Sequence, residues 1–255
     1  MTDHAGVAGP GVTERPVALE LPALRQVVLL AADLATTLAE TRDYLGLDPG
    51  VREVEGMAAL GFEHEVLAID RTFVEIVSPL SADSSPGRLL ARKGEGGYMV
   101  VVQVADLAAV VERAAGLGLT PIMHELLDGN PISQWHPRDL GTLAEIDEMQ
   151  PGHDWHFCPA LTDTGRSDTV ADLASATVAV TDPAAMARRW AALLALPEPS
   201  GSSLSLGGVE LRFVEADDAR TGLIEVGVRP GPQPPTDPAR TLAGVRFACA
   251  EGAPS

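Results

Sequence analysis

The chain has 255 residues, 45% of them hydrophobic, and a formal charge of −18, which excludes wholesale disorder and allows one large domain or two small ones. The strong negative charge argues against nucleic acids and anionic membrane surfaces as partners, because both bind basic surfaces. No apolar run reaches the roughly 20 residues that span a bilayer, no secretory signal begins the chain, and Cys158 and Cys249 make no disulfide framework, so a cytoplasmic location is expected.

One segment occurs three times along the chain, at residues 27–49, 100–121 and 177–197. Each copy has a short β-branched run, then an aspartate, an amphipathic stretch, a leucine-rich end and a proline. The β-branched run predicts a strand and the amphipathic stretch predicts a helix. The aspartate stands where the helix begins, and its carboxylate can accept the free N–H groups of the first turn. These aspartates are Asp33, Asp106 and Asp182.

Further strands are predicted after each of the three helices. Alternating or β-branched segments lie at 62–70 with 72–79, at 132–136 with 142–149, and at 202–206 with 209–215. The last two segments flank Gly207-Gly208, a strong signal for a tight turn. The repeated unit is therefore predicted to be strand–helix–strand–strand–strand.

A fourth, abbreviated unit is predicted at the C-terminal end. Residues 222–230 and 242–251 form its strands, and the proline-rich sequence between them cannot form a helix. The predicted organisation is an N-terminal arm at 1–21, a domain of two full units at 22–150, a linker at 151–172, and a reduced domain at 173–255.

Paired units of this kind resemble the vicinal-oxygen-chelate superfamily, which includes glyoxalases, methylmalonyl-CoA epimerases, bleomycin-resistance proteins and extradiol dioxygenases. The resemblance is most specific over residues 72–149, where TFVEIVSP and HPRDLGTLAEIDEM are similar to the core of the epimerases. It implies an α+β fold in which repeated βαβββ units form curved mixed sheets, in two tandem domains of which the second is reduced. It also implies an eight-stranded cup whose inward side chains hold a divalent metal.

The resemblance assigns the metal ligands residue by residue. Three of the four positions fall on Gln26, Glu75 and Glu145, and the fourth falls on Val100, which cannot ligate a metal and is expected to line the substrate cavity. Apolar neighbours on either side of each glutamate by themselves fit a solvated sheet face, and it is the recurrence of the glutamate on the matching strand of two repeats that favours a shared polar site.

The kind of metal depends on which donors face the cup. Two carboxylates and an amide oxygen suit Mg²⁺ or Mn²⁺, whereas Zn²⁺, Ni²⁺ or Co²⁺ would call for an imidazole, which His64 or His136 supplies if either faces the cup. Because the fourth ligand is missing, a metal-free cup remains open.

Two further groups have competing interpretations. Arg88, with Arg92 and Lys93, forms a basic stretch that suits a carboxylate or phosphate of the substrate, and a solvated helical turn is the alternative. In PGHDWHF at 151–157 the two histidines have the spacing of a metal pair. A structural role is favoured there, in which the aromatic residues pin the linker against a domain.

The leading functional hypothesis is a lyase or an isomerase (epimerase) acting on a small oxygenated metabolite in the cup of residues 22–150. Glu75 and Glu145 are then metal ligands, or the catalytic base and acid if no metal binds. The alternative is a metal-free protein of the bleomycin-resistance type that binds and sequesters a small molecule, and a third option is a scaffold that only associates with another protein. Homodimer formation is left open.

Overall fold

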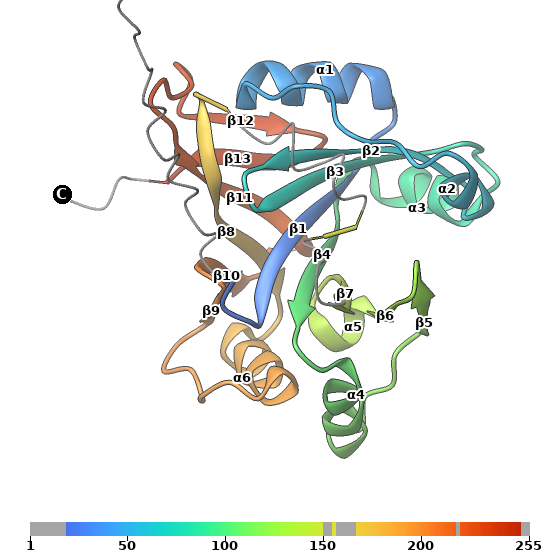
Figure 1. The fold of residues 1–255 in the computed structure, drawn as a ribbon, viewed down its shortest axis with the longest axis vertical. Coiled ribbons are helices and arrows are strands. Elements are labelled where there is room, and N and C mark those ends of the chain that lie inside the picture. The colour runs from blue at the N-terminus through green and yellow to red at the C-terminus, as the bar shows by residue number, and fades with distance from the viewer. Residues whose placement is uncertain (1–18, 150–154, 157–166, 218–219, 251–255) are drawn as a thin grey trace, which may run out of the picture.

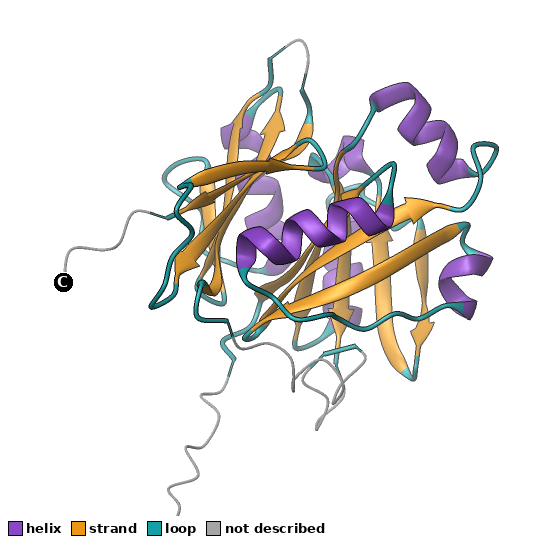
Figure 2. Ribbon diagram, turned by 90° about the horizontal axis from the view of Figure 1, so that it is seen from above, coloured by secondary structure: helices purple, strands orange, loops and turns teal. Residues whose placement is uncertain are grey.

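The computed structural model describes residues 19–149, 155–156, 167–217 and 220–250. These residues form two mixed β-sheets that lie side by side, one built from the N-terminal and one from the C-terminal part of the chain (Figures 1 and 2). No helix in the described part of the chain is long and apolar enough to cross a lipid bilayer.

The first sheet has seven strands in the order β2-β3-β1-β4-β7-β6-β5. Its elements follow the chain as β1 (Ala23–Leu30), α1 (Leu34–Leu45), α2 (Glu55–Ala59), β2 (Phe62–Ile69), β3 (Thr72–Pro79), α3 (Ser85–Lys93), β4 (Gly96–Val104), α4 (Leu107–Gly116), β5 (Met123–Leu127), β6 (Asn130–Trp135), α5 (Pro137–Leu140) and β7 (Leu143–Glu148).

The second sheet has six strands in the order β12-β13-β11-β8-β10-β9. Its elements are β8 (Val170–Val180), α6 (Pro183–Leu194), β9 (Ser203–Leu206), β10 (Val209–Glu215), β11 (Gly222–Pro230), β12 (Ala239–Leu242) and β13 (Val245–Cys249).

The two sheets share one topology. In the first, β1 is parallel to β3 and antiparallel to β4, and β4 is parallel to β7. In the second, β8 is parallel to β10 and antiparallel to β11, and β11 is parallel to β13. No helix separates β11 from β12, so the last unit is the reduced one. The predicted fold class, with repeated units in curved mixed sheets and a reduced second half, is confirmed.

The three repeated helices begin as their sequences predict. The carboxylates of Asp33, Asp106 and Asp182 accept hydrogen bonds from the backbone N–H groups three residues further on, at 2.6, 2.9 and 2.9 Å. Each aspartate therefore satisfies an N–H group that the helix itself leaves unpaired.

The first sheet differs from the eight-stranded cup that the resemblance implied. Its first unit contributes only β1, β2 and β3, and between α1 and β2 an isolated bridge from Val51 to Val66 stands where the missing strand would lie. The edge strand β5, over Met123–Leu127, was not predicted, because most of its side chains are exposed and its residues lack alternation. Strand β8 already begins at Val170, inside the segment expected to be a linker.

The two faces of the first sheet have different surroundings. One face packs against α1, α4, α6 and the second sheet in a single large core, to which Val27, Val74 and Ala144 belong. The other face carries a smaller apolar cluster that includes Val28 and Phe73. We call this second face the cup face.

The sheets meet closely enough to require a glycine in β4. A Cβ atom on Gly97 would lie 2.2 Å from the carbonyl oxygen of Leu223 in β11, so any larger residue would push the sheets apart. The second sheet is therefore packed directly on the first.

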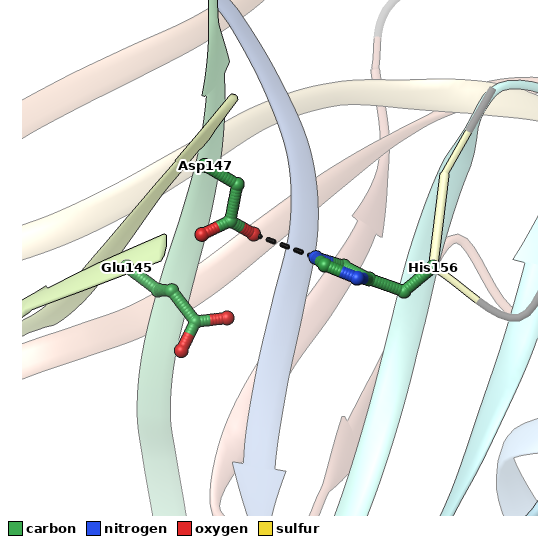
Figure 3. Close-up of side chains that lie close together, drawn as sticks. All are labelled: Glu145, Asp147 and His156. Atoms are coloured by element: carbon green, nitrogen blue, oxygen red, sulfur yellow. Dashed lines mark hydrogen bonds and ion pairs between the residues drawn. The ribbon is translucent and has the colours of Figure 1, made fainter. Parts of the chain in front are cut away.

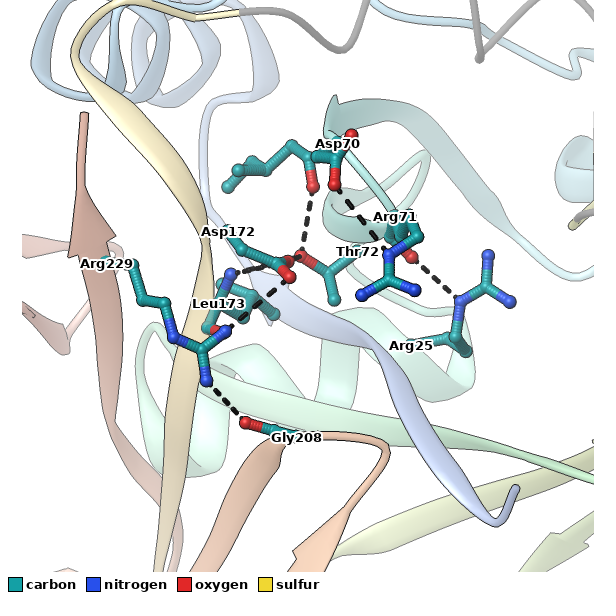
Figure 4. Close-up of polar contacts among 9 residues, drawn as sticks. Arg25, Asp70, Arg71, Thr72, Asp172, Leu173, Gly208 and Arg229 are labelled. Atoms are coloured by element: carbon teal, nitrogen blue, oxygen red, sulfur yellow. Dashed lines mark hydrogen bonds and ion pairs between the residues drawn. The ribbon is translucent and has the colours of Figure 1, made fainter. Parts of the chain in front are cut away.

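A polar junction adds to this packing at the turn between β2 and β3 (Figure 4). The hydroxyl of Thr72 donates to the carboxylate of Asp172 in β8 and accepts from the backbone N–H of Leu173 at 3.1 Å. Arg229 lies 3.7 Å from the same carboxylate and also donates to the carbonyl of Gly208. Burial raises the pKa of Asp172, and these donors offset part of that effect.

Candidate functional site

A row of polar side chains crosses the cup face. Strand pairing aligns Gln134 of β6 with Glu145 of β7, Glu145 with Val101 of β4, and Val101 with Gln26 of β1. Residues paired in this way present their side chains on one face. On β3, Glu75 lies on the same face, because its carboxylate accepts a hydrogen bond from Gln26 at 2.7 Å. The structure thus brings three predicted site residues, Gln26, Glu75 and Glu145, to one face of one sheet.

Val100 does not join them, and its predicted place in the cavity is corrected. It is fully buried in the large core together with Val27 and Ala144, to which it is paired. Because side chains alternate along a strand, its neighbour Val101 faces the cup instead. The position that a fourth metal ligand would occupy is therefore that of Val101, which also cannot ligate a metal.

Glu75 lies at the centre of a directed chain of hydrogen bonds, which we call the Glu75 cluster. The indole N–H of Trp155 donates to Oε1 of Gln26 at 2.9 Å, and Nε2 of Gln26 donates to Oε2 of Glu75. Oε1 of Glu75 lies 2.5 Å from Nδ1 of His64. Nε2 of His64 accepts from the backbone N–H of Glu53 at 2.8 Å, so the ring proton is on Nδ1 and points to Glu75.

These contacts determine the state of Glu75. Both of its oxygens act as acceptors, one from an amide and one from an imidazole. This is the hydrogen-bonding pattern of an ionised carboxylate.

A fixed positive charge lies at the same end of the cup. The guanidinium carbon of Arg25 lies 4.8 Å from the ring centre of Trp155 and 5.5 Å from that of Phe73, and the group donates to the side chain of Gln103. Trp155 is stacked on Phe73 with ring centres 5.8 Å apart. Trp155 is thus buried against the cup, as predicted for the aromatic residues of PGHDWHF.

A second group, the Glu145 cluster, consists of Glu145 and Asp147 of β7 with His156 (Figure 3). One ligand atom from each residue lies within 4.8 Å of the others, and Nε2 of His156 lies 2.9 Å from Oδ2 of Asp147. Gln134 donates to Oε2 of Glu145 at 2.6 Å. The other oxygen of Asp147, Oδ1, is buried without a hydrogen-bond partner among the described residues.

The electrostatics of the Glu145 cluster differ from those of the Glu75 cluster. Burial, together with the neighbouring charge of Asp147, raises the pKa of Glu145 to about 8. Burial also raises the pKa of Asp147 well above its usual range and lowers the pKa of His156. The cup therefore combines Glu75, whose two oxygens both accept hydrogen bonds, with Glu145, whose carboxyl group has a pKa of about 8.

Comparison with known proteins assigns the family. A family model described as a glyoxalase-like domain matches residues 27–194, about two thirds of the chain. The chain belongs to the glyoxalase-like domain family. The family match includes all of the first sheet except the start of β1, and it extends into the second sheet as far as the end of α6.

Solved structures similar to this glyoxalase-like protein cover about half of it. A methylmalonyl-CoA epimerase in complex with methylmalonyl-CoA and NH4+ is 23% identical, covers 52% of this chain and 97% of its own, and has a TM-score of 0.45. Methylmalonyl-CoA epimerase from Mycobacterium tuberculosis is 25% identical over 53% and 93%, with a TM-score of 0.46. A hypothetical protein from Bacillus halodurans C-125 is 20% identical over 52% and 99%, with a TM-score of 0.47. No curated protein sequence matches the chain.

The two clusters of the glyoxalase-like cup differ in how well they suit a divalent metal. In the expected set, Oε1 of Gln26 and both oxygens of Glu75 already accept protein hydrogen bonds. The Glu145 cluster suits a cation better, because Oδ1 of Asp147 is unpartnered within the described chain and one buried and one partly buried carboxyl group lie beside an imidazole. A divalent cation would offset the cost of ionising both carboxyl groups, and this donor set suits transition metals.

The remaining predicted residues have other positions. His64 does face the cup, in contact with Glu75, whereas His136 accepts from the backbone N–H of Arg138 at the start of α5. Arg88 lies on α3 and lines a separate cleft between the sheets. His153 and Phe157 lie outside the described residues.

Sequence reasoning missed Asp147 and assigned His156 only a structural role. Asp147 is two residues from Glu145 on the same strand, so alternation alone places both on one face. That signal was available in the sequence. The position of His156 was not, because its contact with Asp147 joins it to another element of the fold.

The raised pKa of Glu145 predicts how stability depends on pH. Between about pH 5 and 8 the folded protein keeps a proton that the unfolded chain releases, so the free energy of unfolding falls as pH rises. In Glu145→Gln the amide does not ionise, so the variant lacks this loss of stability at high pH. Its side-chain oxygen can still accept the hydrogen bond from Gln134. We expect the variant to resemble the wild type near pH 5 and to be more stable by about 1–3 kcal/mol at pH 9, with screening by solvent taken into account.

Urea unfolding in the presence of a chelator, at several pH values, measures this difference. The matched control is Glu112→Gln, at an exposed position on α4, which should run parallel to the wild type. A constant difference between Glu145→Gln and the wild type from pH 5 to pH 9 would contradict the raised pKa.

Proposed function

We propose that this protein is an enzyme of the lyase or isomerase type that moves a proton on a small oxygenated metabolite bound in the cup. The observation that carries the proposal is the contrast between two carboxyl groups on one sheet face. Glu75 accepts two hydrogen bonds as a carboxylate, while Glu145 has a pKa of about 8. Carboxyl groups in such different states at one pH can serve as base and acid.

In the proposed reaction each side chain has one task. An oxygen of Glu75 accepts a proton from a carbon atom next to the carbonyl group of the substrate. Glu145 donates its proton to the carbonyl oxygen, where negative charge develops. His64 and Gln26 hold the Glu75 carboxylate in place, and Trp155 in turn fixes the orientation of Gln26.

Glu145, Asp147 and His156 would hold a divalent cation if one is part of the working enzyme. Bound there, the cation supplies a positive charge that polarises a substrate oxygen. The ligand protons must leave when it binds, so affinity should rise with pH. In that state Glu145 is a ligand, and the Glu75 cluster alone carries the proton.

A metal-free protein that binds and sequesters a small molecule is the second candidate. It is favoured by Val101, which occupies the fourth ligand position, and by Gln26, whose carbonyl oxygen already accepts from Trp155. In this case the same cup binds a ligand and no bond in the ligand changes.

Deuterium exchange separates the two candidates. A panel of small 2-oxo acids, 2-hydroxy ketones and acyl thioesters is first screened for thermal stabilisation of the protein, with and without Mn²⁺. Each compound that binds is then incubated with the protein in D2O and analysed by mass spectrometry. An enzyme should introduce deuterium next to the carbonyl group, whereas a ligand that binds tightly and gains none would support the sequestering protein.

A further inference from the structure

A cleft between the two sheets lies outside the cup. It encloses about 790 Å³ and is bordered by α3, α5, the start of α6 and the ends of β4 and β8. This volume lies within the range of small-molecule binding sites. Because the second sheet forms one wall, a single glyoxalase-like cup would not contain this cleft.

The charge of the cleft is opposite to that of the protein. The chain carries −18 in total and contains a single lysine, which lines this cleft. Among the described residues that line the cleft, Asp182 is the only carboxylate, and it caps the backbone of its own helix, α6. The cationic side chains that line the cleft are Arg88, Arg92, Lys93, Arg138 and Arg189.

Most of this positive charge is not neutralised by carboxylates. Arg88 and Arg189 donate to backbone carbonyls, of Asp83 and Asp139, and a carbonyl leaves the guanidinium charge uncompensated. Arg138 lies 3.9 Å from a carboxylate oxygen of Asp139, at the outer limit of an ion pair.

The two remaining cations, Arg92 and Lys93, form no ion pair with any residue in the described ranges. Both are exposed at the end of α3. Positive side chains from three helices thus outnumber the carboxylates of the described residues at this cleft, which favours an anion as its ligand although the net charge of the protein is negative.

We propose that this cleft binds a small molecule that carries a diphosphate group. Guanidinium groups match phosphate oxygens with two parallel hydrogen bonds, and a lysine adds a point charge. Arginines on α3, α5 and α6 can contact such a group from several sides, while the hydroxyl groups of Thr142 and Thr181, which also line the cleft, are available as donors. The cleft has room for the rest of a nucleotide-sized molecule. This site does not depend on the proton transfer proposed for the cup.

Binding is tested by calorimetric titration of the full chain with three probes at low ionic strength. Inorganic pyrophosphate and ADP are expected to bind, and citrate, an anion of similar charge, is expected to bind at least about tenfold more weakly. Tighter binding of ADP than of pyrophosphate would indicate a ligand that fills the cleft, and equal binding would indicate recognition of the phosphates alone. Equal binding of citrate, or no binding of either phosphate compound, would overturn the proposal.

Adjacent arginines on α6 provide a matched pair of variants. Arg189 lines the cleft, whereas Arg188 is exposed elsewhere on the helix. Arg189→Gln should weaken pyrophosphate binding about tenfold, as expected for the loss of one charge-assisted contact, and Arg188→Gln should leave it within about twofold. The double variant Arg92→Gln and Lys93→Gln, at two exposed positions, is a second test with little risk to folding. Equal losses in Arg188→Gln and Arg189→Gln would show a general charge effect and overturn the site.

Discussion

Glu75→Gln is expected to slow deuterium exchange into any substrate of the cup by about 10²–10⁴-fold, the range in which positioned general bases contribute. The physical reason is that the amide cannot accept the substrate proton. An amide at this position also presents only one acceptor oxygen to the two donors, Nδ1 of His64 and Nε2 of Gln26. Ligand affinity should change much less, because binding does not require proton transfer.

The measurement is the exchange rate in D2O alongside a binding titration with the same compound. The matched control is Glu63→Gln, next to His64 on β2 but exposed, which should retain the wild-type rate. Mass spectrometry reports the exchange directly. A Glu75→Gln protein that binds and exchanges as fast as the wild type would remove Glu75 from the reaction.

Val100→His and Val101→His are expected to have very different effects, although the two residues are neighbours on β4. Val100 is fully buried in the apolar core against the helices. An imidazole there is too large and lacks a hydrogen-bond partner, so we expect a loss of about 3–5 kcal/mol in the free energy of unfolding. On the cup face, Val101→His places the ring between Gln26 and Glu145, and a loss of only about 1–2 kcal/mol is expected.

Urea unfolding measures these losses, with Val54→His as the exposed control at a valine that is 71% accessible. The same variants test the metal site. Val101→His adds an imidazole beside Glu145 and should tighten Ni²⁺ or Zn²⁺ binding by at least about tenfold, whereas Val100→His should not. If Val100→His were the better tolerated variant and the better metal binder, the assignment of the two faces would be reversed.

Much of the fold could be predicted because its signals are local. The aspartates that begin the repeated helices act on backbone groups within three residues, so their role does not depend on the rest of the molecule. The positions of Glu75 and Glu145 follow from the alternation of side chains along single strands. The threefold repeat predicted the shared topology of the two sheets, and the resemblance to the superfamily agrees with the family match.

The sequence of β4 left its two faces ambiguous. Val100, Val101 and Val102 are all buried, because both faces of the strand are covered by protein. A continuous apolar run has no alternation from which to read the phase. The pairing of β1 with β4 also shifts register between Leu24 and Gln26, so the position of a residue along one of these strands does not by itself give its partner on the other.

By itself, then, the sequence determined the repeated units, the helix starts and the glutamates of the cup, since each depends on neighbours along the chain. Tertiary structure alone decided which valine faces the cup, that His156 lies beside Asp147, and that Arg88 shares a cleft with Arg189. These three relations join residues on different strands, helices or segments, and they arise from sheet register and from the packing of the second sheet on the first. No local pattern encodes such distances, because they are set only when the separate elements pack together.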